Sequence, residues 1–401
     1  MEALCRDERF EADFQRLDGF LFAAEEGHHR DLEDEFDACR AIGVPVEWAD
    51  RAPLSGVDTG RCLRFSNQAR VHPTRYLSGL ARACVELGVQ FHADTAYQDH
   101  SESADGVRVN VSNGVTIHAG AAVFTTNSPV NDKVIIHAKQ EPMRTYVIAG
   151  KVPKRSVTDA LFWDSLEAYH YVRLQPLNSD EELLIIGGED HRSGAANDMD
   201  VRFDALEAWS RVRFPALGGI DYRWSGQVLE PIDFMPFTGR NPGDRHIYVH
   251  TGDSGQGITN GVAASLILLP LILGEDSRFA PVYDPSRKSL TSRASLGQFV
   301  KGQVGVAKNL AEYVTPGEVG SEDAIAPGEG AILREGLAKI AAYKDKHGCV
   351  SRLSAACTHM GCIVHWNSLE KCWDCPCHGS QFAPAGEVLN GPAVESLAKA
   401  D

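Results

Sequence analysis

Apolar residues recur along the first part of the chain with two spacings, one typical of strands and one typical of helices, which together predict a mixture of both. Phe14–Ala23 is apolar and aromatic and predicts a strand. The charged segment Gly27–Ile42 repeats its apolar residues at helical spacing. Pro73 opens a second segment of this kind, and Gly88 ends it. This alternation of helices and strands is typical of an α/β fold.

Strands dominate the middle of the chain. The apolar segments Val107–Val111 and Val115–His118 flank Asn113-Gly114 and predict a hairpin. The helix Val201–Phe214 interrupts a longer series of strands. The other expected strands are Val89–Phe91, Ala121–Thr126, Thr145–Gly150, Tyr169–Leu174, Leu183–Gly188, Tyr222–Leu229 and Ile247–His250.

The end of the chain has a different character. Residues 294–313 predict a connecting helix, and residues 314–330 are rich in glycine and proline and predict a linker. A compact module rich in strands follows from 331 to 401. The expected fold class is therefore an α/β (α+β) body followed by a small all-β domain.

Charge and hydropathy exclude two classes of partner. The formal net charge of −16 repels phosphate backbones, so we expect no nucleic acid. The longest apolar run, Val262–Leu273, is interrupted by Pro270 and is shorter than the ~20 residues that span a bilayer. The N-terminal residues lack the basic start and apolar core of a signal peptide, so we expect a cytoplasmic protein.

Six of the ten cysteines lie between Cys349 and Cys377, which suggests a metal site. The pattern is Cys357-Thr-His359, a spacer, and then Cys375-Pro-Cys-His378, which places two thiolates and two imidazoles on two loops. A structural zinc site could use these ligands, but zinc sites usually contain paired C-x2–4-C ligands. The pattern favours a [2Fe–2S] cluster in which two histidines replace two cysteines on one iron.

This stretch resembles the Rieske family, and specifically the high-potential branch found in respiratory and photosynthetic cytochrome complexes. The resemblance implies that Cys357 and Cys375 bind one iron and that His359 and His378 bind the other. It also implies a disulfide that braces the two loops and a serine that donates a hydrogen bond to a bridging sulfide. One departure is a phenylalanine where those proteins have tyrosine, which removes a hydroxyl donor beside the cluster. The residues concerned are Cys362 and Cys377 for the disulfide, Ser380 for the serine and Phe382 for the departure.

A glycine-rich turn after Ile247–His250 is the second candidate site. In Gly252–Gly261 a strand ends in a turn that opens a helix, and the free N–H groups at such a helix start bind anionic oxygen. The alternative is a tight turn that caps a core helix.

Six blocks make residues 14–313 resemble the glycine/D-amino-acid oxidase family of FAD-dependent oxidoreductases, and the whole chain resembles bacterial fusions of such an enzyme with a Rieske domain. The blocks are Phe65–Pro73, Val123–Pro129, Tyr169–Arg173, Gly187–His191, Trp224–Pro231 and Gly252–Gly261.

The resemblance implies a division of the chain into parts. The body spans 1–313, with FAD-side segments at about 62–140 and 231–293, a substrate-side sheet at about 14–61 and 141–230, and the connecting helix at 294–313. The linker spans 314–330 and the Rieske domain 331–401. The residues expected to contact FAD are Thr126, Asn127, Gly252, Asp253, Gly255, Gly257, Ile258 and Thr259. The residues expected to face a substrate are Tyr169, His170, Tyr171 and Arg173, whereas the sequence identifies no catalytic base.

One feature of the FAD-dependent family is missing from the sequence. The family begins with a strand, Gly-x-Gly-x-x-Gly and a helix that holds the FAD pyrophosphate, and this chain contains no such motif. The chain begins where the family is past its first βαβ unit, which could reflect a gene-start error, a fragment or a true truncation. We therefore expect the chain as written not to retain stoichiometric FAD after gel filtration.

Three functions remain open from the sequence. The first is an FAD-dependent oxidoreductase of the D-amino-acid oxidase type, which would oxidise an amine or amino-acid-like substrate and pass electrons to the Rieske cluster. Its electron acceptor would be a protein or a quinone. The second is a Rieske electron-transfer protein whose flavin body no longer binds FAD. The third is a zinc-stabilised binding protein.

Overall fold

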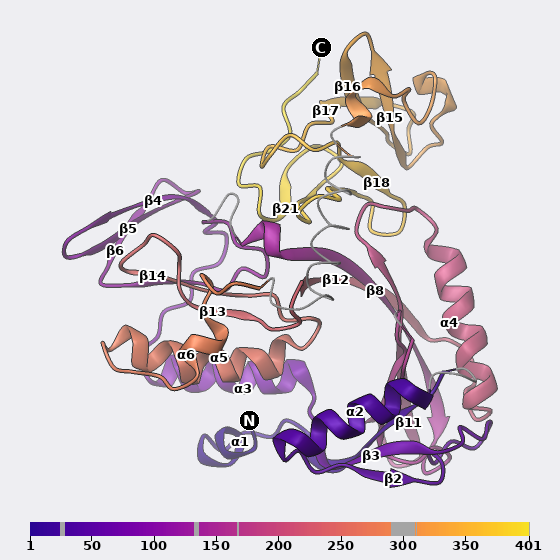
Figure 1. The fold of residues 1–401 in the computed structure, drawn as a ribbon. Coiled ribbons are helices and arrows are strands. Elements are labelled where there is room, and N and C mark those ends of the chain that lie inside the picture. The colour runs from indigo at the N-terminus through magenta and orange to yellow at the C-terminus, as the bar shows by residue number, and fades with distance from the viewer. Residues whose placement is uncertain (25–28, 132–135, 167, 290–308, 310, 401) are drawn as a thin grey trace. The chain divides into compact units, whose positions relative to one another are not determined.

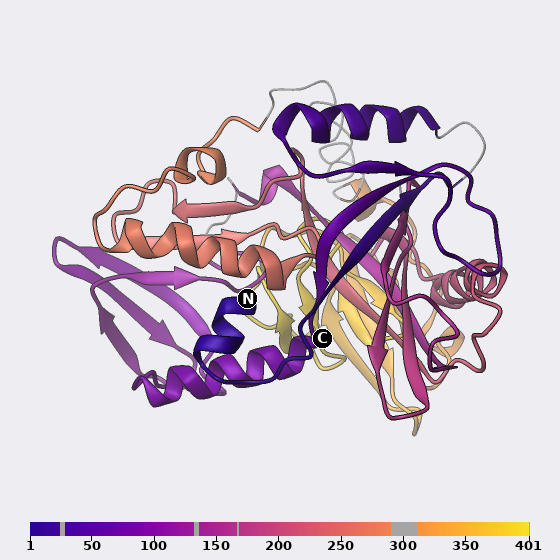
Figure 2. The same cartoon turned by 90° about the horizontal axis from the view of Figure 1, so that it is seen from below.

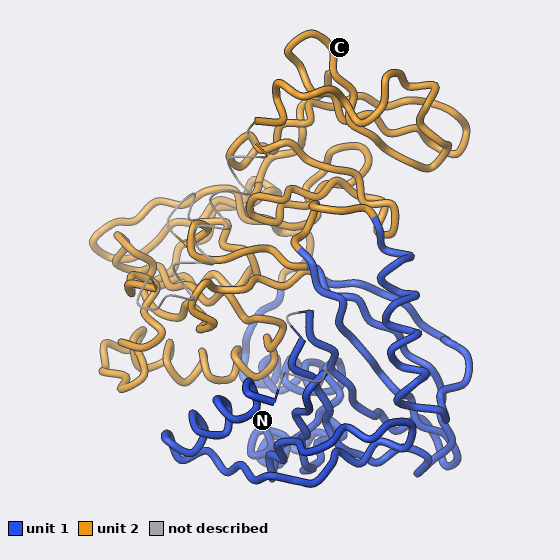
Figure 3. Tube along the Cα trace, turned by 45° about the vertical axis from the view of Figure 1, so that its right-hand side comes forward, with its two compact units in different colours: residues 1–91, 144–191, 198–226 blue, residues 92–143, 192–197, 227–401 orange. Residues whose placement is uncertain are grey.

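The computed structural model describes residues 1–24, 29–131, 136–166, 168–289, 309 and 311–400. The chain forms two compact units, shown in Figure 3. The first unit comprises residues 1–91, 144–191 and 198–226, and the second comprises 92–143, 192–197 and 227–401. Most of the helix expected at 294–313 lies outside the described residues; residues 309 and 311 are helical, and the 3-10 turn Glu312–Val314 follows them.

A sheet of eight strands is the frame of the first unit (Figure 1). Its strand order is β12-β8-β11-β10-β9-β1-β3-β2, and the ends of β8, β11 and β12 belong to the second unit. Five of the strands expected from the sequence are present in this sheet, as β1, β8, β10, β11 and β12. Their bounds are β12 Tyr222–Pro231, β8 Gln140–Pro153, β11 Glu181–Arg192, β10 Tyr171–Pro176, β9 Leu161–Asp164, β1 Gln15–Phe22, β3 Cys62–Arg70 and β2 Glu47–Ala49.

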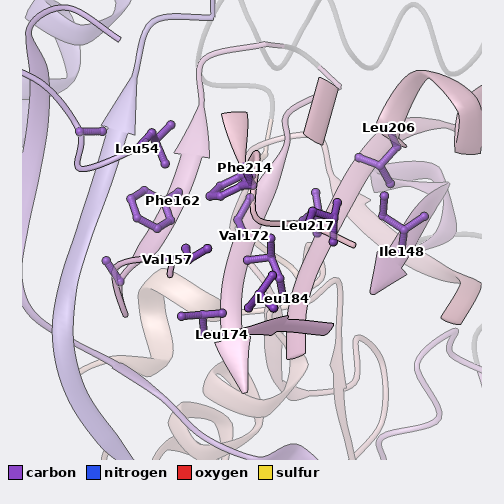
Figure 4. Packing of buried hydrophobic residues seen from close by; sticks show 14 of the residues in the cluster. Leu54, Ile148, Val157, Phe162, Val172, Leu174, Leu184, Leu206, Phe214 and Leu217 are labelled. Atoms are coloured by element: carbon purple, nitrogen blue, oxygen red, sulfur yellow. The ribbon is translucent and has the colours of Figure 1, made fainter. Parts of the chain in front are cut away.

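The main core of the first unit packs one face of this sheet against helix α4, Met199–Arg213. Val172 and Leu174 on β10 are buried, whereas Tyr171 and Arg173 are only half-buried, because successive side chains of a strand point to opposite faces. Figure 4 shows the buried side chains converging from several strands and the segment after α4. Full burial of each leucine or phenylalanine contributes roughly 1.5–3 kcal/mol.

Helix α2, His29–Ile42, covers part of the sheet near β1 and β3 (Figure 2). Leu32 and Cys39 lie on its buried stripe and pack with Leu21 and Leu63 of the two strands. The helical spacing of the apolar residues in this segment therefore has the predicted structural role. The other helices of the first unit are α1 Glu2–Asp7 and α3 Pro73–Glu86, the latter with Pro73 in its first turn.

The second unit contains several smaller sheets. The predicted hairpin is confirmed, with Gly114 at φ +79° in its turn. The predicted strand Val89–Phe91 is wrong: both end residues are exposed, so there is no buried face to pair. Among the described residues no helix is both long and apolar enough to cross a membrane. The elements are β4 Tyr97–Ser103, β5 Gly106–Val111, β6 Thr116–Ala119, β7 Ala122–Phe124, η1 His137–Lys139, β13 Phe237–Arg240, β14 Ile247–Thr251, α5 Gly257–Ile272 and α6 Ala280–Tyr283.

The C-terminal module is all β, as predicted. It contains a three-stranded sheet, β15-β16-β17, and a four-stranded sheet, β18-β19-β20-β21. A core that includes Trp366 and Trp373 lies directly beneath the cysteine-rich loops. The bounds are η3 Glu322–Ala324, β15 Glu329–Glu335, β16 Ala338–Lys344, β17 Val350–Ser354, β18 His365–Asn367, β19 Cys372–Asp374, β20 Gln381–Phe382 and β21 Val388–Asn390.

Candidate iron–sulfur centre and flavin site

Two short loops of the C-terminal module present the predicted cluster ligands. The first loop, 357–362, connects β17 to β18, and the second, 375–380, connects β19 to β20. Each loop closes with a backbone hydrogen bond, from Gly361 N to Cys357 O at 2.8 Å and from Gly379 N to Cys375 O at 3.0 Å. Both glycines have positive φ, which a residue with a side chain rarely adopts. The glycine in each motif thus folds the ligand loop back on itself.

The four predicted ligands converge from these loops. Cys357 and Cys375 are buried, and the rings of His359 and His378 lie 4.9 Å apart, nearly perpendicular to each other. The Nδ1 atom of His378 is buried and has no hydrogen-bond partner among the described residues. Burial, together with the neighbouring His137 and His359, lowers the pKa of His378 to about 3. The ring is therefore neutral, as a metal ligand must be.

The two sulfurs are also suited to iron. A hydrogen bond from Cys375 and backbone N–H groups lower the pKa of Cys357 to about 7, although burial opposes this shift. The same hydrogen bond and burial raise the pKa of Cys375 well above its usual value. Backbone N–H groups of both loops point at the sulfurs and stabilise negative charge there. Two buried cysteine sulfurs, two histidine rings and backbone amide donors together fit a [2Fe–2S] cluster.

The predicted disulfide between the loops is present. Cys362 and Cys377 are joined with an S–S distance of 2.09 Å. The sulfurs of Cys362, Cys375 and Cys377 all lie within 4.8 Å of one another. This trio is not a metal site, because two of its sulfurs are bonded to each other. Cys375 is the member of the trio that remains for iron.

Ser380 and Phe382 follow the second loop and are both fully buried. The Ser380 hydroxyl accepts a hydrogen bond from Ala393 N at 3.1 Å and donates its proton toward the Cys357 sulfur. Phe382 pairs with Trp373 across β19 and β20 and packs in the core beneath the loops. Ser380 is thus positioned as a donor to the cluster, whereas Phe382 has no proton to donate.

We predict opposite shifts of the cluster reduction potential for two substitutions. Ser380→Ala should lower the potential and Phe382→Tyr should raise it, because hydrogen bonds to sulfur stabilise the more negative reduced state. A hydrogen bond of about 1 kcal/mol corresponds to roughly 40 mV for a one-electron couple. Redox titration followed by EPR measures both shifts. An unchanged potential in Phe382→Tyr would show that the ring at 382 does not point at the cluster.

The residues expected at the flavin come together at the carboxyl ends of two neighbouring parallel strands. Strand β7 pairs with β14, and Thr126-Asn127 and Gly252 follow these strands. Thr251 Oγ1 donates to Asn127 O at 2.5 Å, which joins the two ends. Asn127 has φ +60°, a left-handed conformation that turns the chain sharply. The carboxyl ends of parallel strands are where α/β folds bind cofactors.

The turn after β14 leads into helix α5. Gly252 and Gly255 have positive φ, and a Cβ on Gly252 would lie 2.6 Å from Pro231 Cγ, so this close approach requires glycine. Within the turn, Asp253 Oδ1 lies 2.9 Å from His250 Nε2. Exposed Gly257 begins the helix, with Ile258 and Thr259 in its first turn. The N–H groups of this turn have no partner within the helix and are available to anionic oxygen.

The expected substrate residues lie on the first unit, and two of them bind other protein groups. His170 is buried, with Nδ1 2.7 Å from Asp164 and Nε2 3.2 Å from Glu189, and stacks on Trp209 at 4.2 Å. Arg173 donates to Val71 O at 2.7 Å and to Gln175 Oε1 at 2.9 Å, and burial lowers its pKa. Tyr169 lies 5.6 Å from Tyr171 between ring centroids.

A polar network beside Tyr171 was not predicted from the sequence. The Tyr171 ring lies across Gly187, where any Cβ would overlap it, and its hydroxyl is 3.1 Å from Thr145 Oγ1. The Thr145 hydroxyl donates to Asp190, so Tyr171 donates to Thr145. Burial raises the pKa of Asp190 to about 6. Asp190 Oδ1 is buried with no hydrogen-bond partner in the part of the chain that the structure describes. In the sequence, the Gly-Gly-Glu-Asp segment at 187–190 is the feature that could have indicated this network.

The chain belongs to the FAD dependent oxidoreductase family, which matches residues 1–269, and carries a Rieske [2Fe-2S] domain, which matches residues 316–401. These two domains indicate FAD and a [2Fe–2S] cluster as cofactors and define an oxidoreductase.

Individual proteins share this organisation or one part of it. The putative Rieske 2Fe-2S iron-sulfur protein YhfW of Bacillus subtilis is 27% identical over 404 residues, which span 100% of this chain and 78% of the relative. The cytochrome b6-f complex iron-sulfur subunit of a Synechococcus strain is 58% identical over 45 residues, 11% of this chain and 26% of that subunit. The crystal structure of glycine oxidase from Geobacillus kaustophilus has a TM-score of 0.59 at 18% identity and covers 72% of this chain and 80% of that chain, which shows a shared fold.

Proposed function

We propose that this protein oxidises the C–N bond of an amine or amino-acid-like substrate in the manner of the D-amino-acid oxidase type and delivers the electrons to its own Rieske centre. Bound FAD would supply the hydride acceptor, and the [2Fe–2S] cluster would carry the electrons singly. The observation that carries the proposal is the presence, in one chain, of a helix-start turn suited to a flavin and of a complete Cys2His2 ligand set. The electron acceptor is a protein or a quinone.

Each part of the chain has a defined task in this proposal. Cys357, His359, Cys375 and His378 would hold the cluster. Residues 126–127 and 252–259 would hold FAD, with the first turn of α5 providing N–H groups for anionic oxygen of the flavin ring. On the substrate side, Tyr169, His170 and Arg173 remain candidates, and we add Asp190, because a buried carboxylate oxygen without a protein partner suits a cationic amine.

We predict that Asp190→Asn raises KM for amine substrates roughly tenfold or more, because a hydrogen bond to a charged group is worth about 1.5–3 kcal/mol. The carboxylate exists only above its raised pKa of about 6, so the wild-type KM should fall as pH increases through about 6. Dye reduction by a panel of amino acids and secondary amines measures both effects. The exposed Asp180→Asn is the matched control. A variant at 190 with an unaltered KM–pH profile would exclude this role.

The proposed function is tested on anaerobically purified protein. We expect two irons and two labile sulfides per chain, and after reduction an EPR signal with average g below 2. Flavin absorbance after gel filtration measures FAD retention, and an active substrate should bleach the cluster spectrum when FAD is added. Stoichiometric zinc without sulfide would contradict the cluster. An iron-replete, FAD-supplemented protein that no amine reduces would contradict the oxidase and favour the electron carrier.

A further inference from the structure

The second ligand loop, 375–380, is bound by side chains from outside the Rieske domain. Arg192 Nε donates to Pro376 O at 3.0 Å, and Gln227 Nε2 donates to Gly379 O at 2.8 Å. Ser128 Oγ lies 3.5 Å from His378 O. All of these residues belong to the second compact unit. Three carbonyl groups of one short loop are therefore contacted by three separate segments of the body.

The same loop is closely packed against these segments. A Cβ on Gly379 would lie 2.6 Å from Gln227 Nε2 and 3.0 Å from Pro142 Cβ. A Cβ on Gly194 would lie 3.2 Å from Pro376, which leaves little space there. Close packing and hydrogen bonds thus occur together at this contact, as in specific protein interfaces.

His137 contacts the histidine ligands themselves. Its ring centroid lies 4.9 Å from that of His359 and 5.5 Å from that of His378, edge to face in both cases. The side chain is buried, and its Nε2 donates to Pro129 O at 2.9 Å, which fixes the ring. Because the two cysteine ligands are buried and the two histidine ligands are partly exposed, the histidines form the edge of the cluster that a redox partner can reach.

The segment that carries His137 also borders the proposed flavin site. Asn127 accepts a hydrogen bond from Thr251, and Gln140 Oε1 lies 3.4 Å from Thr251 Oγ1 and close to Gly252. Residues on both sides of His137 therefore contact the turn that leads into α5. One short stretch of chain touches both candidate cofactor sites.

We propose that His137 positions the histidine edge of the cluster for electron exchange inside this chain, with Arg192 and Gln227 holding the second ligand loop in place. The His137 ring would also shield part of this edge from reductants in solution. Each transfer would move one electron from reduced flavin to the oxidised cluster, and no covalent bond would form or break. The inference rests on the proposed function for the identity of the donor, but the shielding of the edge can be measured without flavin or amine.

The test is the rate at which dithionite reduces the cluster of the full chain, followed by stopped-flow absorbance. His137→Ala should increase the second-order rate constant severalfold and shift the EPR g values of the reduced cluster, while exposed His118→Ala should change neither. Arg192→Gln should also increase the rate. Loss of a positive charge would by itself slow reduction of the cluster by the anionic dithionite. A faster reduction would therefore mean that the contact between Arg192 and the second ligand loop had opened.

A second measurement separates this inference from the proposed function. In FAD-supplemented protein without substrate, photoreduction of the flavin should be followed by bleaching of the cluster, and His137→Ala should slow that step severalfold. If His137→Ala loses iron, the dithionite reduction rates and g values of Arg192→Gln and His137→Phe test the inference instead. If the iron-replete variants have the same dithionite reduction rates and g values as the wild-type protein, the inference is wrong, whatever the outcome of the amine panel.

Discussion

Replacement of Cys357 with alanine is expected to remove the iron–sulfur cluster completely. Cys357 and Cys375 are the two buried sulfurs outside the disulfide on the ligand loops, and one thiolate cannot hold the iron that both would share. Iron and labile sulfide should fall from two of each per chain to none, with loss of the visible spectrum and of the EPR signal. The same result is expected for Cys375→Ala.

A matched control distinguishes loss of a ligand from damage to the module. Cys349 belongs to the same domain but is exposed and lies outside both ligand loops. Cys349→Ala should retain the full cluster. Circular dichroism should show that the Cys357 variant keeps its strands, since two packed cores stabilise the module. Retention of two irons in folded Cys357→Ala would contradict the assignment of the ligand.

Replacement of both Cys362 and Cys377 with serine should leave a cluster that assembles but is lost quickly. The disulfide joins residues 15 apart in sequence, and removal of a link that closes a loop of this size costs about 3 kcal/mol. Without it, only packing and hydrogen bonds would hold the two ligand loops together. The half-life of the visible spectrum in the presence of an iron chelator measures the effect, and the potential should shift as well.

The bond itself can be detected independently. Mass spectrometry of protein alkylated without reduction, with the cluster intact, should show Cys362 and Cys377 protected. Free alkylation of both residues while the spectrum persists would show that the loops are held by packing alone. Cys349→Ser is the control for the serine substitutions and should leave the half-life unaltered.

Local motifs made much of the candidate site predictable from sequence. Ligand spacing, the loop glycines and the hairpin turn are set by residues close together in the chain, so the sequence pattern reports them directly. The prediction of a strand at Val89–Phe91 was wrong because a short apolar run does not indicate whether a partner strand exists.

Contacts set by sheet order and by distant segments could not be predicted in this way. Thr145, Asp190 and Tyr171 meet because β8, β11 and β10 are neighbours in the sheet, an order unrelated to the order of these strands in the chain. His137 and His378 are separated by most of the Rieske domain and half of the body, yet their rings touch. Such pairings depend on tertiary packing, which no local pattern encodes.

The closeness of three sulfurs in the ligand loops imposes an order on maturation. The Cys375 sulfur lies within 4.8 Å of the sulfurs of Cys362 and Cys377, so an oxidant that acts on the polypeptide before iron binds has a choice of cysteine pairs. A crosslink that includes Cys375 would destroy the iron site. Iron delivered first occupies Cys375 and leaves a single pair to oxidise. We therefore expect metal loading to precede oxidation of Cys362 and Cys377 when the protein assembles correctly.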